Sequence, residues 1–236
     1  MIRVVLFDVD DTLCDDRGQM VRCIRETADL AARFAPRLDA RELAEAYGEI
    51  ADRFWFEEFS LAPPPPLDEI RRLLWGRALT AVGETCFEGL RTRLAARYDA
   101  LRKEPIAPFP GTVETLAALK ARGFALAALT NGFSETHVPK IEALCVAPLL
   151  ASVFTPDRLG VAKPDSRAFH RACAQLGFLP GEGIHVGDSP TSDIDGAKRA
   201  GLRAAWFNPH GNAFPAGCLA PDVEISTLPE LLDYLS

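Results

Sequence analysis

The stretch VVLFDVDDTL, residues 4–13, passes from a short apolar, β-branched segment directly into carboxylates. The apolar part predicts a buried strand, and Asp8 and Asp10 stand two positions apart where that strand ends. Side chains alternate along a strand with a period of two, so we expect both carboxylates to point the same way. Like charges held together need a cation, a shared proton or solvent. The stretch predicts a divalent metal and a nucleophile, and a simple turn is the alternative interpretation.

Length and composition place the chain among globular proteins. It has 236 residues, of which 48% are hydrophobic and 25% are charged, which is typical of a protein that can bury a core. This length accommodates one large domain or a core with an insertion. The net charge of -7 argues against a nucleic-acid partner, because nucleic-acid-binding domains are usually basic. An anionic substrate stays possible, because net charge says little about a local pocket.

The sequence predicts neither a signal peptide nor a framework of paired cysteines. The apolar run at residues 4–7 is too short for the core of a signal peptide, and no stretch approaches the roughly 18 apolar residues of a membrane span. We therefore expect a cytoplasmic protein without a membrane partner. The cysteines contain no CxxC pair, which favours reduced thiols over disulfides or a zinc site; they are Cys14, Cys23, Cys86, Cys145, Cys173 and Cys218. We expect Cys14, beside the acidic motif, to be a small buried thiol.

From about residue 108 onward, short apolar runs alternate with helical patterns. This alternation predicts an α/β fold, a doubly wound parallel sheet with helices on both faces. The predicted strands are 124–129, 152–154, 183–186, 203–207 and 223–225. The predicted helices between and after them are 112–122, 134–144, 165–176, 191–200 and 227–235.

The segment 15–107 has a different pattern, which is almost entirely helical. Helices are expected at 19–35, 40–59, 67–81 and 84–101, and the proline run 63–66 predicts a stiff extended connector. The first strand with its acids therefore belongs to the later sheet. We predict an α/β core domain made of residues 1–14 and 108–236, with an inserted α-helical cap domain at 15–107.

Four polar motifs lie at or just past the ends of predicted strands. Any one of them can be a turn, a helix start or an N-cap. Together they would gather at the carboxyl edge of the sheet, where open α/β sheets form their ligand crevice. The motifs are Asp8 to Thr12, Thr130-Asn131-Gly132, Lys163-Pro164-Asp165 and Gly187 to Asp193.

With these four motifs in this order, the chain resembles the haloacid dehalogenase superfamily of hydrolases. The resemblance spans the core, all four motifs and the helical insertion between the first two. The return from cap to core at Phe109-Pro110-Gly111 is also similar to that family. The resemblance implies a Rossmann-like core with a cap domain and a magnesium-dependent phosphatase, a phosphoric monoester hydrolase.

The resemblance implies a role for each catalytic residue. Asp8 would be the nucleophile that forms an aspartyl-phosphate intermediate. Lys163 would balance the charges of Asp8 and of the phosphate oxygens. Thr130 and the amide of Asn131 would donate hydrogen bonds to the phosphoryl group, where negative charge develops.

The resemblance also implies a set of Mg²⁺ ligands, and Mg²⁺ prefers hard oxygen atoms in an octahedron. Asp8 and Asp188 would supply carboxylates, and Asp10 would supply its backbone carbonyl. Asp193 would hold a metal-bound water or bind the metal directly.

Asp10 has the most diagnostic position. A second carboxyl group can protonate the leaving alkoxide and then deprotonate the attacking water, as general acid and then general base. Family members that cleave carbon–halogen bonds lack an acid there, because a halide needs no proton. Asp10 therefore favours hydrolysis of a phosphate ester over dehalogenation, whereas Thr12 is expected to tie the loop through its hydroxyl.

Other catalytic patterns find no support. The four histidines share no metal-ligand spacing, so we expect His185 in the core of a strand and His137, His170 and His210 at the surface. The sequence has no Gly-x-Ser-x-Gly elbow and no Gly-rich phosphate-binding loop.

The prediction is a phosphatase for a small phosphorylated metabolite, acting as a monomer or homodimer. The alternatives are a phosphomutase of the same family, a 2-haloacid dehalogenase, and a non-catalytic binding module on the same scaffold.

Overall fold

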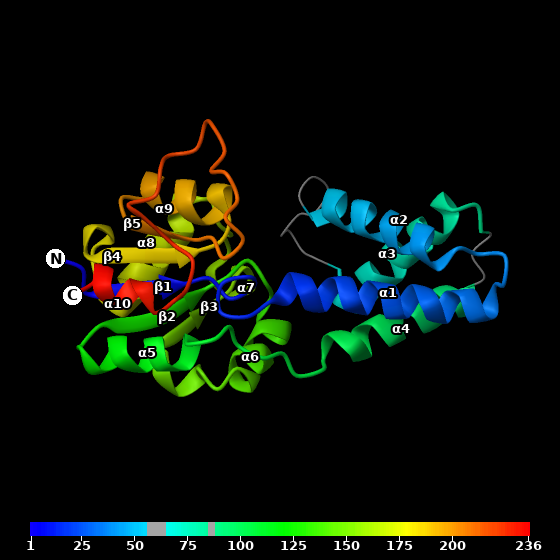
Figure 1. Ribbon diagram of the computed structural model, residues 1–236, viewed down its shortest axis with the longest axis horizontal. Coiled ribbons are helices and arrows are strands. Elements are labelled where there is room, and N and C mark those ends of the chain that lie inside the picture. Colours follow the sequence, from blue (N-terminus) through cyan, green and yellow to red (C-terminus); the bar gives the residue numbers. More distant parts are fainter. Residues whose placement is uncertain (56–64, 85–87) are drawn as a thin grey trace. The chain divides into compact units, whose positions relative to one another are not determined.

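A computed structural model gives the structure of the chain and describes residues 1–55, 65–84 and 88–236 (Figure 1). The chain divides into two compact units, one of Met1–Asp16 with Pro105–Ser236 and one of Arg17–Glu104. Some predictions lie outside the described residues: Cys86, the end of the 40–59 helix, the first half of the proline run and the start of the 84–101 helix.

A six-stranded parallel sheet forms the centre of the first unit, in the order β3-β2-β1-β4-β5-β6. From β1 in the middle the chain builds outward to β3 on one side and to β6 on the other, which makes the sheet doubly wound and confirms the predicted α/β class. Each predicted strand forms, with ends shifted by at most one residue. The strands are β1 Val4–Phe7, β2 Ala125–Leu129, β3 Ser152–Phe154, β4 Gly183–Gly187, β5 Arg203–Phe207 and β6 Val223–Ile225.

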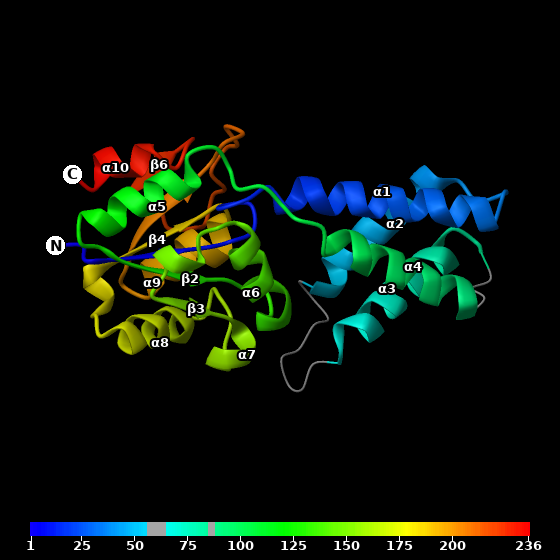
Figure 2. The same cartoon turned by 90° about the horizontal axis from the view of Figure 1, so that it is seen from below.

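Helices cover both faces of this sheet. Alternate side chains of β1 point to opposite faces, so Val5 and Phe7 join one hydrophobic cluster while Val4 and Leu6 join another. The first cluster includes residues of α5 Thr112–Ala121, α6 Ser134–Ala143 and α10 Glu230–Tyr234. The second includes residues of α8 Ser166–Leu176 and α9 Gly196–Arg199. Figure 2 shows α5 and α10 on one side of the strands and α8 on the other.

Two local structures depart from the predicted helices. A short helix, α7 Pro156–Leu159, follows β3 where a loop is expected. A π-helical turn occupies Pro190–Asp195, so that α9 covers only the end of the predicted 191–200 helix. Both pieces are too short to carry a readable hydrophobic period.

The second unit is helical, as its sequence pattern predicts. Its helices are α2 Ala40–Arg53, α3 Leu67–Ala81, α4 Glu88–Arg102 and α1 Asp16–Phe34, whose first residue belongs to the other unit. The ring of Trp75 stacks on Tyr47 with centroids 4.1 Å apart, inside a hydrophobic cluster confined to this unit. Across the described ranges, none of the helices has the length and apolar character needed to cross a membrane.

Candidate active site

Asp8 is the first residue after β1, and its backbone still belongs to the sheet. Its N–H donates to the Val186 carbonyl at 2.9 Å, so β4 fixes its position. The chain then turns, with hydrogen bonds from the N–H groups of Thr12 and Leu13 to the Val9 carbonyl. Asp8 itself is 9% exposed, so its carboxylate is largely buried at the carboxyl edge of the sheet.

Lys163 joins two of the predicted site carboxylates. Its Nζ lies 2.8 Å from Asp8 Oδ1 and 2.6 Å from Asp193 Oδ1, with only 1% of the lysine side chain exposed. Burial disfavours the charged ammonium, but the two carboxylates more than offset it and raise the pKa of Lys163. The buried lysine is therefore a fixed positive charge beside Asp8.

Asn131, at the end of β2, holds the backbone that carries this lysine. Its side-chain amide donates to the Lys163 carbonyl and accepts from the Lys163 N–H, both at 2.9 Å. The neighbouring Thr130 donates its N–H to the Phe154 carbonyl, and its hydroxyl accepts from the Gly132 N–H at 3.2 Å. The second and third motifs thus form one hydrogen-bonded unit around Lys163.

Asp193 lies fully buried in the π-helical turn and has three donors. Lys163 Nζ and His185 Nε2 reach its Oδ1, and the Ser189 N–H donates to its Oδ2 at 3.0 Å. Burial raises the pKa of a carboxyl group, but Lys163 and His185 outweigh it and hold the pKa of Asp193 below its ordinary value. His185 is a core residue, as predicted, and its ring contacts this carboxylate.

Three carboxylates come close enough together to bind one cation. Oxygen atoms of Asp8, Asp188 and Asp193 lie within 4.8 Å of one another. Burial, with the neighbouring carboxylates, raises the pKa of Asp188 to about 8, and burial raises that of Asp8 to about 7 against the opposing pull of Lys163. The raised pKa values mean that the protein groups around Asp8 and Asp188 do not fully balance the charge of two carboxylates. A hard divalent cation would balance it and fits such a set of oxygen donors.

Two hydrogen bonds position Asp188. Trp206 Nε1 donates to its backbone carbonyl at 2.8 Å, and the Thr12 hydroxyl lies 3.5 Å from its Oδ1. Thr12 is fully buried and therefore ties the first motif to the fourth, in agreement with the structural role expected for it.

The side chain of Asp10 has different partners, on α6. His137 Nε2 lies 3.0 Å from its Oδ2, and Lys140 Nζ lies 2.5 Å from its Oδ1. Partial burial disfavours the charged carboxylate, but these two groups outweigh it and hold the pKa of Asp10 below its ordinary value. The sequence predicts that the Asp8 and Asp10 side chains point the same way, but their carboxyl groups have different partners. The reason is that β1 ends at Phe7, so the alternation of side chains along a strand does not continue to Asp10.

The prediction that His137 lies at the surface is wrong, and no sequence motif points to Lys140. His137 is 5% exposed because Gly132 leaves room for its ring: a Cβ on Gly132 would lie 1.7 Å from its Cε1. The spacing of three residues between His137 and Lys140, directly after the Thr-Asn-Gly motif, is the signal that could have found them, since such residues share a helix face. His170 and His210 are exposed, as expected.

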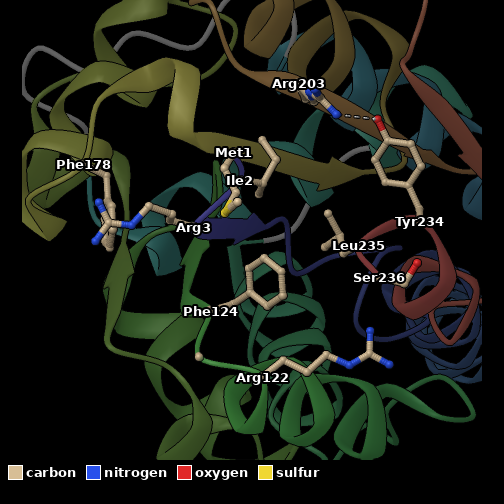
Figure 3. A pocket seen from close by; sticks show the side chains of 11 residues that line it. Met1, Ile2, Arg3, Arg122, Phe124, Phe178, Arg203, Tyr234, Leu235 and Ser236 are labelled. Carbon is tan, nitrogen blue, oxygen red and sulfur yellow. Dashed lines mark hydrogen bonds between the residues drawn. The ribbon is translucent and has the colours of Figure 1, made fainter.

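The residues outside this edge offer less chemistry. A pocket at the opposite, amino-terminal edge of the sheet is lined by residues near the starts of strands and by the C-terminal residues, among them Arg3, Arg122 and Arg203 (Figure 3). Their guanidinium groups are already engaged, by Glu182, the Leu232 carbonyl and the Tyr234 hydroxyl.

Cys14 is fully buried, and burial raises the pKa of its thiol, which makes it a poor nucleophile as expected.

Known proteins are similar to this chain in sequence and in fold. The model of the haloacid dehalogenase-like hydrolases matches residues 2–201, a range that includes all four motifs. The phosphoserine phosphatase of Thermus thermophilus is 30% identical over 227 residues, covering 88% of this chain and 89% of that protein.

Solved structures of other proteins are similar to this chain in their three-dimensional fold. A 2-haloacid dehalogenase from Pseudomonas syringae pv. Tomato DC3000 matches with a TM-score of 0.71 and 30% identity, over 100% of this chain and 98% of that one. The magnesium-bound YfnB of Bacillus subtilis matches with a TM-score of 0.78 and 24% identity, over 100% of this chain and 99% of that one. Phosphatases and dehalogenases both occur among the similar proteins.

Proposed function

This chain is an enzyme of the haloacid dehalogenase-like hydrolase family, and we propose that it is a Mg²⁺-dependent phosphatase for small phosphorylated metabolites. The observation that carries the proposal is the pairing of Asp8 with the buried Lys163, with a second carboxyl group on Asp10 in the same turn. A nucleophile, a fixed positive charge and an acid–base group are the parts that hydrolysis of a phosphate monoester requires.

In this proposal Asp8 attacks phosphorus. One carboxylate oxygen bonds to phosphorus while the bond to the ester oxygen breaks, which gives an aspartyl phosphate and a leaving alkoxide. Lys163 lies 2.8 Å from Asp8 and balances charge on the phosphoryl oxygens. Thr130 and the backbone N–H of Asn131 donate hydrogen bonds to those oxygens, while the Asn131 side chain keeps Lys163 in place.

Asp10 distinguishes this reaction from dehalogenation. His137 and Lys140 favour the ionised form of Asp10 in the free protein, so Asp10 has to gain a proton when the substrate binds. Its carboxyl group then gives that proton to the leaving oxygen and takes one from the water that attacks the aspartyl phosphate. A halide leaves without a proton, so a dehalogenase has no use for this acid. Although a dehalogenase is among the similar structures, Asp10 favours a phosphatase.

The acidic cluster fits Mg²⁺. Asp8 and Asp188 would bind the ion through carboxylate oxygens, with the backbone carbonyl of Asp10 as a further ligand. Asp193 already has three hydrogen-bond donors, so we assign it the role of orienting Lys163. When bound, the ion supplies charge neutralisation for the phosphoryl group.

The relatives and the same residues support the proposed substrate class. The phosphoserine phosphatase relative is named for a small phosphorylated amino acid. An acid at Asp10 suits alkyl esters of this size, because an alkoxide leaves poorly unless it is protonated.

A screen of the purified protein tests the proposal. Phosphate release is measured over a panel of small phosphorylated metabolites and 4-nitrophenyl phosphate, with Mg²⁺ and with a chelator, and halide release from 2-chloropropionate runs in parallel. We expect Mg²⁺-dependent phosphate release and no halide release. Halide release without phosphate release would establish the dehalogenase alternative, and transfer of phosphate to an acceptor sugar would establish the mutase.

A further inference from the structure

Two side chains of α6 each hold one oxygen of the Asp10 carboxyl group. His137 Nε2 lies 3.0 Å from Oδ2, and Lys140 Nζ lies 2.5 Å from Oδ1. Because the partners stand three residues apart on one helix, the carboxyl group cannot rotate without losing a contact. The plane of the Asp10 carboxyl group is therefore fixed.

The two partners are fixed at their far ends as well. Thr136 donates its hydroxyl to the Phe133 carbonyl at 3.1 Å, and the same oxygen lies 2.9 Å from His137 Nδ1, so the His137 ring is held at both of its nitrogen atoms. Lys140 Nζ also contacts Asp16 Oδ1 at 2.6 Å. This chain of contacts runs from Asp16 through Lys140, Asp10 and His137 to Thr136, all within the first unit.

The three contacting side chains differ in how far they are exposed to solvent, and this difference suits a reaction. The side chains of His137 and Lys140 are 7% and 9% exposed, whereas that of Asp10 is 33% exposed. Only Asp10 offers its carboxyl group to an incoming molecule, while its two partners stay behind it. A purely structural ion pair has no need for this asymmetry.

Resting on the proposed phosphatase function, we infer that His137 and Lys140 are positioning residues that aim the Asp10 carboxyl group at the leaving oxygen. They act through Asp10 and do not touch the substrate. Gly132 is part of the same arrangement, because any larger residue there would displace the His137 ring.

Leaving-group dependence tests the inference. Phenyl phosphate and 4-nitrophenyl phosphate share a phosphoryl group and ring, but phenolate is the poorer leaving group and depends more on a proton from Asp10. We compare His137→Leu, which has no donor, with His137→Gln, whose amide can still donate to Asp10. Lys140→Met removes the second partner, and Lys120→Met on α5, whose Nζ donates to the Pro148 carbonyl, is the matched control.

We expect His137→Leu and Lys140→Met to lower kcat for phenyl phosphate by about 100-fold and for 4-nitrophenyl phosphate by less than about tenfold. KM should stay nearly constant, and His137→Gln should recover most of the lost kcat. In an Asp10→Asn background, adding His137→Leu should cost nothing further. If Lys140→Met does not fold, the pair at position 137 decides alone.

Equal loss for both substrates, or additive loss in the Asp10→Asn background, would overturn the positioning role. The proposed function has its own outcome, because a wild-type protein that hydrolyses neither the phenyl esters nor any ester of the metabolite panel fails as a phosphatase and takes the inference with it. A wild-type protein that hydrolyses both, with variants indistinguishable from it, leaves the phosphatase standing and removes only the positioning role.

Discussion

Single residues around Lys163 differ in how far their charge is compensated. Asp193 accepts three hydrogen bonds and has a lowered pKa, whereas the pKa values of Asp8 and Asp188 are raised to about 7 and about 8. Three aspartates with the same side chain thus differ in pKa because their surroundings differ. Asp193 acts as the fixed anion of Lys163, and the other two gain most from a cation.

Replacing Asp193 by asparagine tests this division. Asp193→Asn leaves Lys163 with one buried counter-charge fewer, and breaking such a pair costs about 3–5 kcal/mol. We expect a loss of this size in the free energy of unfolding, measured with urea, together with a fall in kcat of about 100-fold or more.

The control is Asp195→Asn, two residues along the chain, which breaks an i,i+4 ion pair with the exposed Arg199 and leaves an oxygen that can still accept the Leu219 N–H. It should cost less than about 1 kcal/mol. If both variants lose the same stability, the buried Asp193 pair is not what holds Lys163.

At the scale of elements, the site depends on how strands end. β1 stops at Phe7, one residue before Asp8, and β4 stops at Gly187, one residue before Asp188. The apolar runs of the sequence place these ends to within one residue. The partners beyond them are not predictable in the same way, because α7 and the π-helical turn depend on tertiary contacts.

Gly187 shows how closely the end of β4 packs on this turn. A Cβ at that position would lie 2.3 Å from Asp193 Cγ. Gly187→Ala should therefore move the Asp193 carboxylate and lower kcat about as much as Asp193→Asn does. Gly181→Ala is the control, because nothing lies within 4 Å of its added Cβ. A Gly187→Ala protein with wild-type kcat would show that the turn tolerates the shift.

Sequence reasoning succeeded for residues whose type states their chemistry. The structure gathers Asp8, Lys163, Asp188 and Asp193, which all come from motifs at strand ends. It failed for His137, whose surroundings depend on a glycine five residues earlier. The spacing from Lys140 places both side chains on one helix face, but only the fold reveals that this face meets Asp10.

At the scale of the whole molecule, the site residues belong to one unit although they come from both sides of the insertion. Asp8 and Asp10 precede the helical unit, whereas Thr130, Lys163 and Asp188 follow it. The parallel sheet brings the two parts together, since β1 lies between β2 and β4. Folding of the first unit is therefore coupled to assembly of the acidic cluster.

This coupling predicts how stability depends on pH and Mg²⁺. Asp8 and Asp188 have folded pKa values of about 7 and about 8, above the value of about 4 in an unfolded chain. Their contribution is fully present below about pH 4 and is lost as the pH rises through about 7 to 8. Mg²⁺ binds the ionised forms, so at a fixed concentration it should raise Tm more at about pH 8 than at about pH 6.

Thermal unfolding by differential scanning calorimetry, with Mg²⁺ and with a chelator, measures this difference. Asp188→Asn should remove most of the Mg²⁺-dependent increase in Tm at both pH values. An increase that is the same at both pH values, or that survives in Asp188→Asn, would place the ion elsewhere.

The most direct test of the phosphatase mechanism is to look for phosphate on Asp8 during turnover. The wild-type protein is mixed with 4-nitrophenyl phosphate and Mg²⁺, quenched in acid within the first turnovers and mapped by peptide mass spectrometry. We predict a phosphoryl group on the peptide that contains Asp8, and neither the adduct nor turnover in Asp8→Asn. Persistent Mg²⁺-dependent turnover in Asp8→Asn would contradict the account.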